Sequence, residues 1–205
     1  MTDAPTVFVI DDNPGIRRSL RALLESVGLR VETYAAADEF LDAYDAERTG
    51  CLVLDVRLKR ANGLELQDEL RRRKALIPII VLTGHGNVPM SVRALRAGAV
   101  DFLQKPVAPA VLVERVHAAI ETDRLARAAV TERANVGARL GHLTPRERQV
   151  LDLLVDGKTS KEIAAALGLS VRTVEGYRRM VLLKMDVGSA AQLVRNVLIA
   201  RKPRG

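Results

Sequence analysis

Cysteine, tryptophan and long apolar runs are scarce or missing in this sequence. The single cysteine, Cys51, excludes an intramolecular disulfide and is typical of a reducing compartment. No apolar run approaches the roughly 20 residues of a membrane-spanning helix. The polar N-terminus lacks the basic start and long apolar stretch of a signal peptide. We therefore expect a soluble, cytoplasmic protein with no membrane partner.

Aromatic residues make up only 3% of the chain, whereas 48% of its residues are hydrophobic. The core must therefore be built from Leu, Val, Ile and Ala. Cys51 lies inside an apolar run, so we interpret it as a small core residue rather than a nucleophile. The three histidines, His85, His117 and His142, are too dispersed for a metal site.

Charge is divided unevenly along the chain. Residues 1–123 contain 16 Lys and Arg and 18 Asp and Glu, whereas residues 124–205 contain 16 and 7. A chain of 205 residues suits one or two domains. A near-neutral first part and a basic second part indicate two domains, of which only the second faces a polyanion.

Apolar runs and helical patterns alternate five times over the first 121 residues. Such alternation predicts an α/β domain with a parallel sheet and helices on both faces. For five strands, we expect the order 2-1-3-4-5, which places the first and third strands side by side. The expected strands cover 6–10, 29–34, 51–54, 78–82 and 100–103, and the expected helices cover 14–27, 36–44, a segment after 63, 88–97 and 110–121.

Polar residues follow the ends of four of these strands: Asp11 with Asp12, Asp55, Thr83 and Lys105. The carboxyl ends of parallel strands form the edge where open α/β sheets bind their ligands. Three carboxylates repel one another unless a hard cation such as Mg²⁺ lies among them. A hydroxyl, the backbone N–H of Gly84 and an ammonium can hold phosphoryl oxygens. The pattern thus indicates an acid that becomes phosphorylated beside a metal.

The second part predicts a small helical domain. Thr144, Pro145 and Glu147 form a capping-box pattern. We expect Ser160 to cap the next helix, and a Gly turn leads to a basic helix from Val171 to about residue 184. The expected inward residues of that helix are Val171, Val174, Val181 and Leu182. A short helix, a tight turn and a basic helix are typical of a helix-turn-helix, although charge alone also fits a bundle with a solvated basic face.

Residues 6–121 resemble the receiver domain of a response regulator, a flavodoxin-like fold. The matching motifs are Asp11-Asp12, Val53-Leu54-Asp55-Val56, Leu82-Thr83-Gly84-His85-Gly86 and Asp101-Phe102-Leu103-Gln104-Lys105-Pro106, with 79–106 close to the FixJ branch. The resemblance implies that Asp55 accepts a phosphoryl group from a histidine kinase. It implies Mg²⁺ on Asp12, Asp55 and the Arg57 backbone carbonyl, with Asp11 acting through water. It also makes Thr83 and Phe102 a switch pair, makes Lys105 the phosphate clamp, and favours a cis Lys105–Pro106 bond.

Residues 142–205 resemble a LuxR-type DNA-binding domain of the FixJ/NarL regulators. The matching motifs are Leu143-Thr144-Pro145-Arg146-Glu147-Arg148, Lys161-Glu162-Ile163-Ala164 and Val171-Arg172-Thr173-Val174-Glu175. The resemblance implies that Glu175, Gly176 and Arg179 read bases of double-stranded promoter DNA. Phosphate contacts map onto Lys161, Arg172, Thr173, Tyr177 and Lys184. The helix that follows Ser189 corresponds to the usual dimerisation helix.

Three stretches depart from these patterns or fall between them. Lys59 and Arg60 follow the expected phosphoacceptor where the receiver family usually has a proline and small residues. Gly176 interrupts the recognition helix, and Tyr177 stands where a histidine is common. Residues 122–141 are expected to be a linker that is helical in its first part, with a flexible break at Gly137 and Gly141.

Two other functions compete with a phosphorylation-dependent transcriptional regulator. A phosphatase that works through an aspartyl-phosphate needs a second acid near Asp55, but Arg57 stands two residues on, so we expect no enzyme activity beyond self-phosphorylation and dephosphorylation. A receiver that accepts no phosphate is disfavoured by the intact strand-end residues. For activation, we expect a homodimer in which Arg93 or Arg96 of one copy pairs with Asp101 of the other. A domain–domain clamp released on phosphorylation is the alternative.

Overall fold

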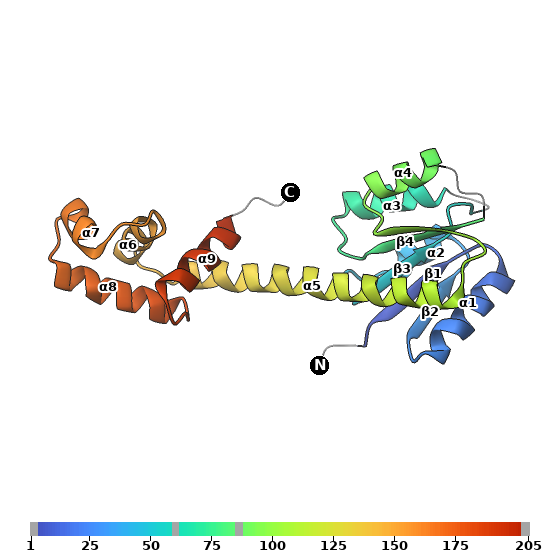
Figure 1. The fold of residues 1–205 in the computed structure, drawn as a ribbon, viewed down its shortest axis with the longest axis horizontal. Helices are drawn as coiled ribbons and strands as arrows, with labels where there is room; N and C mark the ends of the chain where they lie inside the picture. The colour runs from blue at the N-terminus through green and yellow to red at the C-terminus, as the bar shows by residue number, and fades with distance from the viewer. Residues whose placement is uncertain (1–3, 59–61, 85–87, 202–205) are drawn as a thin grey trace. The chain divides into compact units, whose positions relative to one another are not determined.

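The computed structural model describes residues 4–58, 62–84 and 88–201 (Figure 1). By its internal contacts the chain divides into two compact units, Met1–Arg127 and Ala128–Gly205. Their boundary lies inside the segment 122–141 that we expected to be a linker. The Lys59-Arg60 departure and the His85-Gly86 part of a receiver motif lie outside the described residues. Within the described chain, no helix is long and apolar enough to cross a membrane.

The first unit is built on a five-stranded parallel sheet with the order β2-β1-β3-β4-β5, as predicted. The strands are β1 (Thr6–Ile10), β2 (Arg30–Tyr34), β3 (Gly50–Leu54), β4 (Ile79–Thr83) and β5 (Asp101–Gln104). The helices are α1 (Pro14–Ser26), α2 (Ala37–Ala43), α3 (Gly63–Arg72), α4 (Val88–Arg96) and α5 (Pro109–Gly141). Strands and helices alternate along the chain, which accounts for the parallel pairing of every neighbouring strand.

Alternate residues of the strands point to opposite faces of the sheet and form two separate cores. On one face, Phe8 and Leu54 pack with Phe40 of α2 and Leu70 of α3. On the other, the strands pack against α1 and against the first part of α5. Cys51 is buried in this second core, and burial together with the Asp123 charge raises the pKa of its thiol to about 12. This confirms its interpretation as a core residue.

Strand register brings the expected site residues to one edge of the sheet. Ile10 of β1 is level with Leu54 of β3, so Asp11 and Asp55 are the next residues of two adjacent strands. On β5, Gln104 is level with Thr83 of β4, and the N–H of Lys105 donates to the carbonyl of Thr83 at 2.8 Å.

Helix α5 is longer than predicted and corrects our expectation for the linker. It continues through Gly137 and ends at Gly141, so the segment 122–141 is helical throughout rather than only in its first part. A glycine inside a helix costs only about 1 kcal/mol relative to alanine. The neighbouring Val136 is 1% exposed and packs in the core of the second unit. Tertiary packing therefore outweighs the low helix propensity of Gly137.

The second unit contains the four predicted helices: α6 (Pro145–Val155), α7 (Ser160–Leu167), α8 (Val171–Lys184) and α9 (Ala190–Arg201). The capping box of Thr144 and Glu147 is present at the start of α6. A second capping box, formed by Thr159 and Glu162, is present at the start of α7. We expected Ser160 to be the N-cap of this helix, but the N-cap is Thr159 and Ser160 is the first helical residue. The Thr159 hydroxyl accepts a hydrogen bond from the N–H of Glu162, and the Glu162 carboxylate accepts one from the N–H of Thr159.

Helices α7 and α8 form the predicted helix-turn-helix. Gly168 ends α7 in the left-handed conformation (φ 64°), which a glycine adopts without steric cost, and Ser170 caps α8. Val174 and Val181 are buried as expected, but Val171 is 43% exposed, so its inward assignment was wrong. Val171 is the first residue of α8, and the buried residues of this helix, Val174 and Val181, lie further along it. Helix α8 continues through Gly176 without interruption.

Candidate functional site

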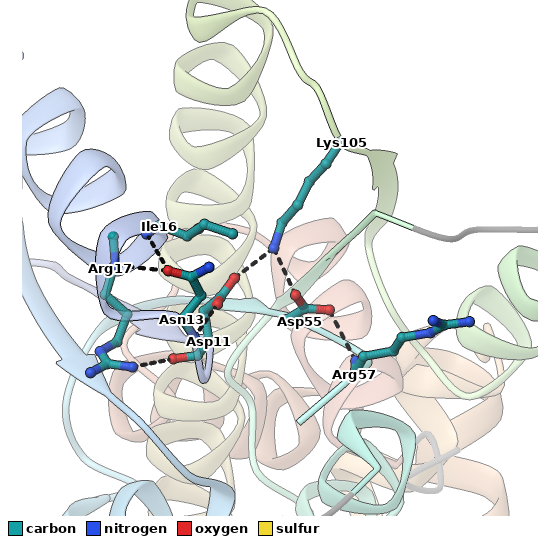
Figure 2. A network of polar contacts seen from close by, with 8 residues as sticks. Asp11, Asn13, Ile16, Arg17, Asp55, Arg57 and Lys105 are labelled. Atoms are coloured by element: carbon teal, nitrogen blue, oxygen red, sulfur yellow. Dashed lines mark hydrogen bonds and ion pairs between the residues drawn. The ribbon is translucent and has the colours of Figure 1, made fainter. Parts of the chain in front are cut away.

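Asp55 is the first residue after β3 and is held from two sides. Its Oδ2 accepts a hydrogen bond from the Lys105 ammonium at 2.7 Å, and its Oδ1 accepts one from the N–H of Arg57 at 3.0 Å (Figure 2). The Asp55 side chain keeps 12% of its surface exposed. A carboxylate fixed in this way, at the sheet edge and still reachable from solvent, can serve as a nucleophile toward an incoming group.

Asp11 lies beside Asp55 and is almost fully buried. Its Oδ2 accepts from Lys105 at 2.5 Å, and its Oδ1 accepts from the N–H of Asn13 at 2.8 Å. Asn13 also caps α1 through its side-chain oxygen, and Arg17 donates to the Asp11 carbonyl at 2.6 Å. Sequence reasoning missed Asn13, although an Asn directly before a helix-starting proline is a recognisable cap signal.

Lys105 joins the two acids into one network (Figure 2). Burial alone lowers the pKa of a lysine, but the hydrogen bonds that Lys105 donates to Asp11 and Asp55, and the charges of the two acids, raise the pKa of Lys105 above its usual value. The ammonium is therefore charged at neutral pH. Because it has three donors and sits between both acids, it can also approach an oxygen added to Asp55.

The other expected members of the site lie at the same edge. Thr83 is fully buried at the end of β4. Phe102 is partly buried on the side of the sheet where α2, α3 and α4 pack. The Lys105–Pro106 peptide is cis, which confirms that prediction. Asp12 is partly exposed directly after Asp11, and Arg57 forms an isolated bridge with Asn62.

Gly63 holds the segment after Asp55 in place, a role that sequence reasoning did not assign. Its N–H donates to the carbonyl of Val56 at 2.9 Å. A Cβ at position 63 would lie 2.4 Å from the Asp55 carbonyl oxygen and 3.0 Å from the Cα of Val56. Only glycine allows the two backbones to approach this closely.

The donor set at this edge suits a hard divalent cation. Asp11, Asp12 and Asp55 carry three negative charges and Lys105 one positive charge, which leaves a net charge of −2 for a cation such as Mg²⁺ to neutralise. Within 4–58, 62–84 and 88–201, no three acidic, His or Cys side chains form a ready metal cluster. Mg²⁺ usually keeps several waters and binds only one or two carboxylates, so the carboxylate oxygens at this edge are suitable ligands for it. Each carboxylate oxygen that accepts one hydrogen bond retains a second lone pair.

The expected DNA-contacting residues lie mostly on the surface of α7 and α8. Six of them are exposed: Lys161, Arg172, Thr173, Glu175, Gly176 and Arg179. Tyr177 is half-buried because its ring packs against the core of the second unit. Arg172, Glu175 and Arg179 recur at spacings of three and four, which places them on one side of α8.

Ser160 connects the two helices of the helix-turn-helix. Its hydroxyl donates to Glu175 and accepts from Arg178 at 2.7 Å. A serine hydroxyl has one proton and two lone pairs, so it can satisfy an acid and a guanidinium together. Glu175 is therefore oriented before any DNA arrives. Sequence reasoning found Glu175 but interpreted Ser160 only as a cap.

Lys184 forms hydrogen bonds at the start of α6. Its ammonium donates to Glu147 at 2.7 Å and to the carbonyl of His142 at 3.4 Å. Glu147 is 5% exposed and also accepts from the N–H of Thr144 at 2.7 Å. The Lys184 hydrogen bond and the Thr144 N–H lower the pKa of Glu147. A DNA phosphate would therefore share Lys184 with a buried carboxylate.

Two family descriptions match the chain, one for each unit. "Response regulator receiver domain" matches residues 7–117, and "Bacterial regulatory proteins, luxR family" matches residues 141–197. The first covers the sheet edge with Asp11, Asp55, Thr83 and Lys105, and the second covers α6, α7, α8 and α9 as far as Val197.

Full-length relatives share both units in the same order. The transcriptional regulatory protein FixJ of Azorhizobium caulinodans is 45% identical over 200 residues, which cover 98% of this chain and 95% of that protein. Nodulation protein W of Bradyrhizobium diazoefficiens is 46% identical over 197 residues, 95% and 87% of the two chains. The structure of the response regulator StyR, 40% identical, matches with a TM-score of 0.82 over 96% of this chain and 99% of StyR. Full-length FixJ from B. japonicum, 39% identical, matches with a TM-score of 0.60 over 96% and 97%.

Proposed function

The chain belongs to the FixJ family of two-component response regulators with a receiver domain and a LuxR-type DNA-binding domain, and we propose that phosphorylation of Asp55 controls its binding to promoter DNA. Membership of this family makes it a transcriptional regulator and not a catalytic enzyme. It also implies a histidine kinase and DNA as partners. We assign residues 1–121 to the receiver, 122–141 to the connecting segment and 142–205 to the DNA-binding domain. Regulators of this family are typically cytoplasmic, and we propose that location here.

The single observation that supports Asp55 as phosphoacceptor is its position between Lys105 and the Arg57 N–H. Asp11 is nearly buried, with both of its oxygens engaged by Lys105 and Asn13, so Asp55 is the more accessible nucleophile of the two. An Asp55 oxygen would take the phosphoryl group from a phosphohistidine of the kinase. Lys105 would then donate to an oxygen of the transferred group.

Receiver domains generally use Mg²⁺ for phosphorylation. We propose that Asp12, Asp55 and the Arg57 carbonyl hold the ion, with Asp11 acting through water. When bound, the ion neutralises negative charge on the phosphoryl oxygens. Asn13 and Arg17 fix the segment that carries Asp11 and Asp12, and the hydrogen bond from Arg57 orients Asp55.

Thr83 and Phe102 form the proposed switch. Thr83 is buried at the end of β4, and its hydroxyl can approach a phosphoryl oxygen on Asp55. Val81 of β4 is level with Phe102 of β5, so Thr83 and Phe102 lie on the same face of the sheet. An inward shift of Thr83 would leave room for Phe102 to rotate and would change the surface of α4 and β5.

Replacement of Asp55 tests the phosphoacceptor assignment. We expect Asp55→Asn to lose the mass increase that acetyl phosphate and Mg²⁺ cause in the intact protein. Asp12→Asn should retain Asp55 but react more slowly, because one carboxylate for the ion is lost. Unchanged phosphate incorporation in Asp55→Asn would show that another residue is modified.

For DNA, we propose that Glu175, Gly176 and Arg179 face the bases while Lys161, Arg172, Thr173, Tyr177 and Lys184 contact phosphates. The exposure of six of these residues supports their access to DNA. Arg179 can form a bidentate pair with a guanine, and the absence of a side chain at Gly176 allows α8 to approach the groove closely. Lys184 is the least free of the phosphate contacts, because Glu147 shares its ammonium.

The base-reading assignment is tested by comparing two cations. Arg179→Ala should cost about 1–3 kcal/mol on the preferred site and little on random DNA. Lys161→Ala should weaken both DNAs alike and reduce the salt dependence of binding. If Arg179→Ala weakens specific and random DNA equally, Arg179 is a phosphate contact instead.

We also propose that phosphorylation produces a homodimer through α4 and β5. Leu95 and Val100 are exposed apolar residues of this segment, 49% and 43% accessible. Asp101 forms an ion pair with Arg115 of α5 at 3.2 Å. Arg93 or Arg96 of a second copy would therefore have to share or replace Arg115 as the partner of Asp101.

A further inference from the structure

An open hollow of about 340 Å³ lies between α3 and α4, two helices that run next to each other on the receiver (Figure 1). This volume falls at the small end of the range of small-molecule sites. The hollow is separate from the Asp55 site, because none of its lining residues belongs to that site. It is lined by Leu64, Asp68, Arg71, Pro89, Val92, Arg93, Arg96 and Ala97.

The lining carries more positive than negative charge. Arg71 pairs with Asp68 at 3.2 Å, but the Arg71 side chain is 65% exposed, and exposed pairs of this kind contribute little. Across the described chain, no carboxylate lies at ion-pair distance from Arg93 or Arg96. Three guanidinium groups and one carboxylate give the hollow a net charge of +2.

The arginines of α4 have a partial local explanation. Arg93 and Arg96 occupy the last turn of α4, where the helix dipole favours cations, and their spacing of three places them on one side of the helix. Arg71 likewise lies in the last turn of its own helix, α3, so the two dipoles account for a cation at each helix end but not for the meeting of these cations at one hollow. Convergence of cations from two helices on one concave surface is what a bound anion requires.

We propose that this hollow binds a small phosphate monoester with an apolar body. A guanidinium fork matches two oxygens of a phosphate, and the net charge of +2 matches the two negative charges of a monoester at neutral pH. Leu64, Pro89, Val92 and Ala97 offer apolar contact to the rest of the ligand. The inference goes beyond the proposed function and does not depend on which residue is phosphorylated.

Adjacent arginines of α3 provide a matched test. Arg71 lines the hollow, whereas Arg72 does not and pairs with Glu69 at 2.7 Å. Phenyl phosphate is titrated into the ¹⁵N-labelled full chain in EDTA, and the arginine Nε–H resonances are followed by NMR. EDTA leaves the carboxylates around Asp55 negative, so that site repels the probe.

We expect saturable shifts and an affinity about tenfold weaker in Arg71→Ala and in Arg96→Ala, since each removes one charge-assisted contact. Arg72→Ala should bind like the original chain, and phenyl sulfonate, with one negative charge, should bind more weakly. Equal losses in Arg71→Ala and Arg72→Ala would overturn the proposal, as would the absence of saturation. Tighter binding of an acidic peptide than of phenyl phosphate, with loss in Arg71→Ala, would instead make the hollow a peptide-docking surface.

Folding is controlled independently of binding. Both Arg71 and Arg72 are more than 60% exposed, so neither replacement should change the urea midpoint of the receiver. Loss of binding in Arg71→Ala with an unchanged midpoint therefore supports the site directly.

Discussion

At the scale of single residues, the shared hydrogen bonds of Lys105 would determine how the proposed phosphorylation site responds to its own modification. Before phosphorylation, the ammonium is held by Asp11 and Asp55 at 2.5 and 2.7 Å. A phosphoryl group on Asp55 adds oxygens with more negative charge than the carboxylate they extend. Because the ammonium has three donors, we expect Lys105 to bind an oxygen of this group while it keeps its hydrogen bond to Asp11.

Gly63→Ala is predicted to disturb this site from outside it. The new Cβ would lie 2.4 Å from the Asp55 carbonyl oxygen, and backbone atoms cannot rotate away as a flexible side chain can. We expect a loss of about 1–3 kcal/mol in the free energy of unfolding of the receiver. Phosphate uptake from acetyl phosphate should also slow, because the segment that carries Asp55 and Arg57 must shift.

The control for this prediction is Gly137→Ala. Gly137 lies inside α5, and apart from the backbone of its own helix and its two chain neighbours, no atom of the described residues lies within 4 Å of a Cβ built there. Alanine there should stabilise the helix by about 1 kcal/mol and leave phosphate uptake unchanged. Urea unfolding and intact-mass kinetics measure both variants, and equal behaviour of the two would contradict the steric argument.

At the scale of elements, the contacts of α5 with the sheet continue past the last sequence motif of the receiver. Asp123 is 1% exposed, pairs with Arg127 at 2.9 Å and accepts from the N–H of Gly50 at 2.9 Å. Arg127 also donates to the carbonyls of Ala46 and Arg48, each at 2.8 Å. This network anchors the helix to the amino end of β3. By its contacts, the first compact unit therefore extends to Arg127, past the receiver boundary that we propose at residue 121.

The second unit has a comparable buried pair, Glu147 of α6 with Lys184 at the end of α8. The lowered pKa of Glu147 means that its stabilisation is present above the ordinary glutamate pKa and is lost as pH falls through the lower folded value. We expect Glu147→Gln to reduce stability by about 1–3 kcal/mol at pH 7 and to remove part of the acid sensitivity below about pH 4.5.

Hydrogen exchange of α6 and α8 amides at pH 7 and pH 4 measures this effect in the full chain. Glu132→Gln is a suitable control, because Glu132 is exposed on α5 in the same unit. Protection factors that change with pH in Glu147→Gln as steeply as in the original chain would assign the acid sensitivity to other groups.

At the scale of the whole molecule, the two units differ in charge and therefore in partner. The basic second part attracts DNA, whereas the nearly neutral first part does not. Phosphorylation of the first unit therefore needs a physical route to change DNA affinity. Dimerisation provides one, since two tethered DNA-binding units gain affinity for a palindromic site through effective concentration.

We predict that beryllofluoride, a phosphoryl mimic, doubles the mass of the full chain in light scattering at tens of micromolar, roughly the range of a weak signalling interface. Asp55→Asn should stay monomeric under the same conditions. Arg93→Glu should weaken the dimer by placing an acid opposite Asp101. A monomeric activated chain that nevertheless binds DNA more tightly would favour the domain–domain clamp.

The sequence by itself determined the order of the elements and most of the site. Strands β1, β3 and β4 are short apolar runs, polar residues stand at the ends of these strands and of β5, and parallel strands must present those ends together, so Asp11, Asp55 and Lys105 were predictable from spacing. The second unit was likewise marked by local signals, namely the Thr144 capping box at the start of α6 and the turn at Gly168 between α7 and α8. These features are short-range, and a linear pattern records them.

Only the tertiary structure decided features that depend on contacts between distant residues. The helix through Gly137 follows from the burial of Val136, and the requirement for glycine at position 63 follows from the approach of Asp55. The exposure of Val171 and the engagement of Lys184 by Glu147 depend on how α8 packs, which its own periodicity does not specify. The hollow with Arg71 and Arg96 exists because α3 and α4 lie next to each other, and no local pattern pairs their side chains.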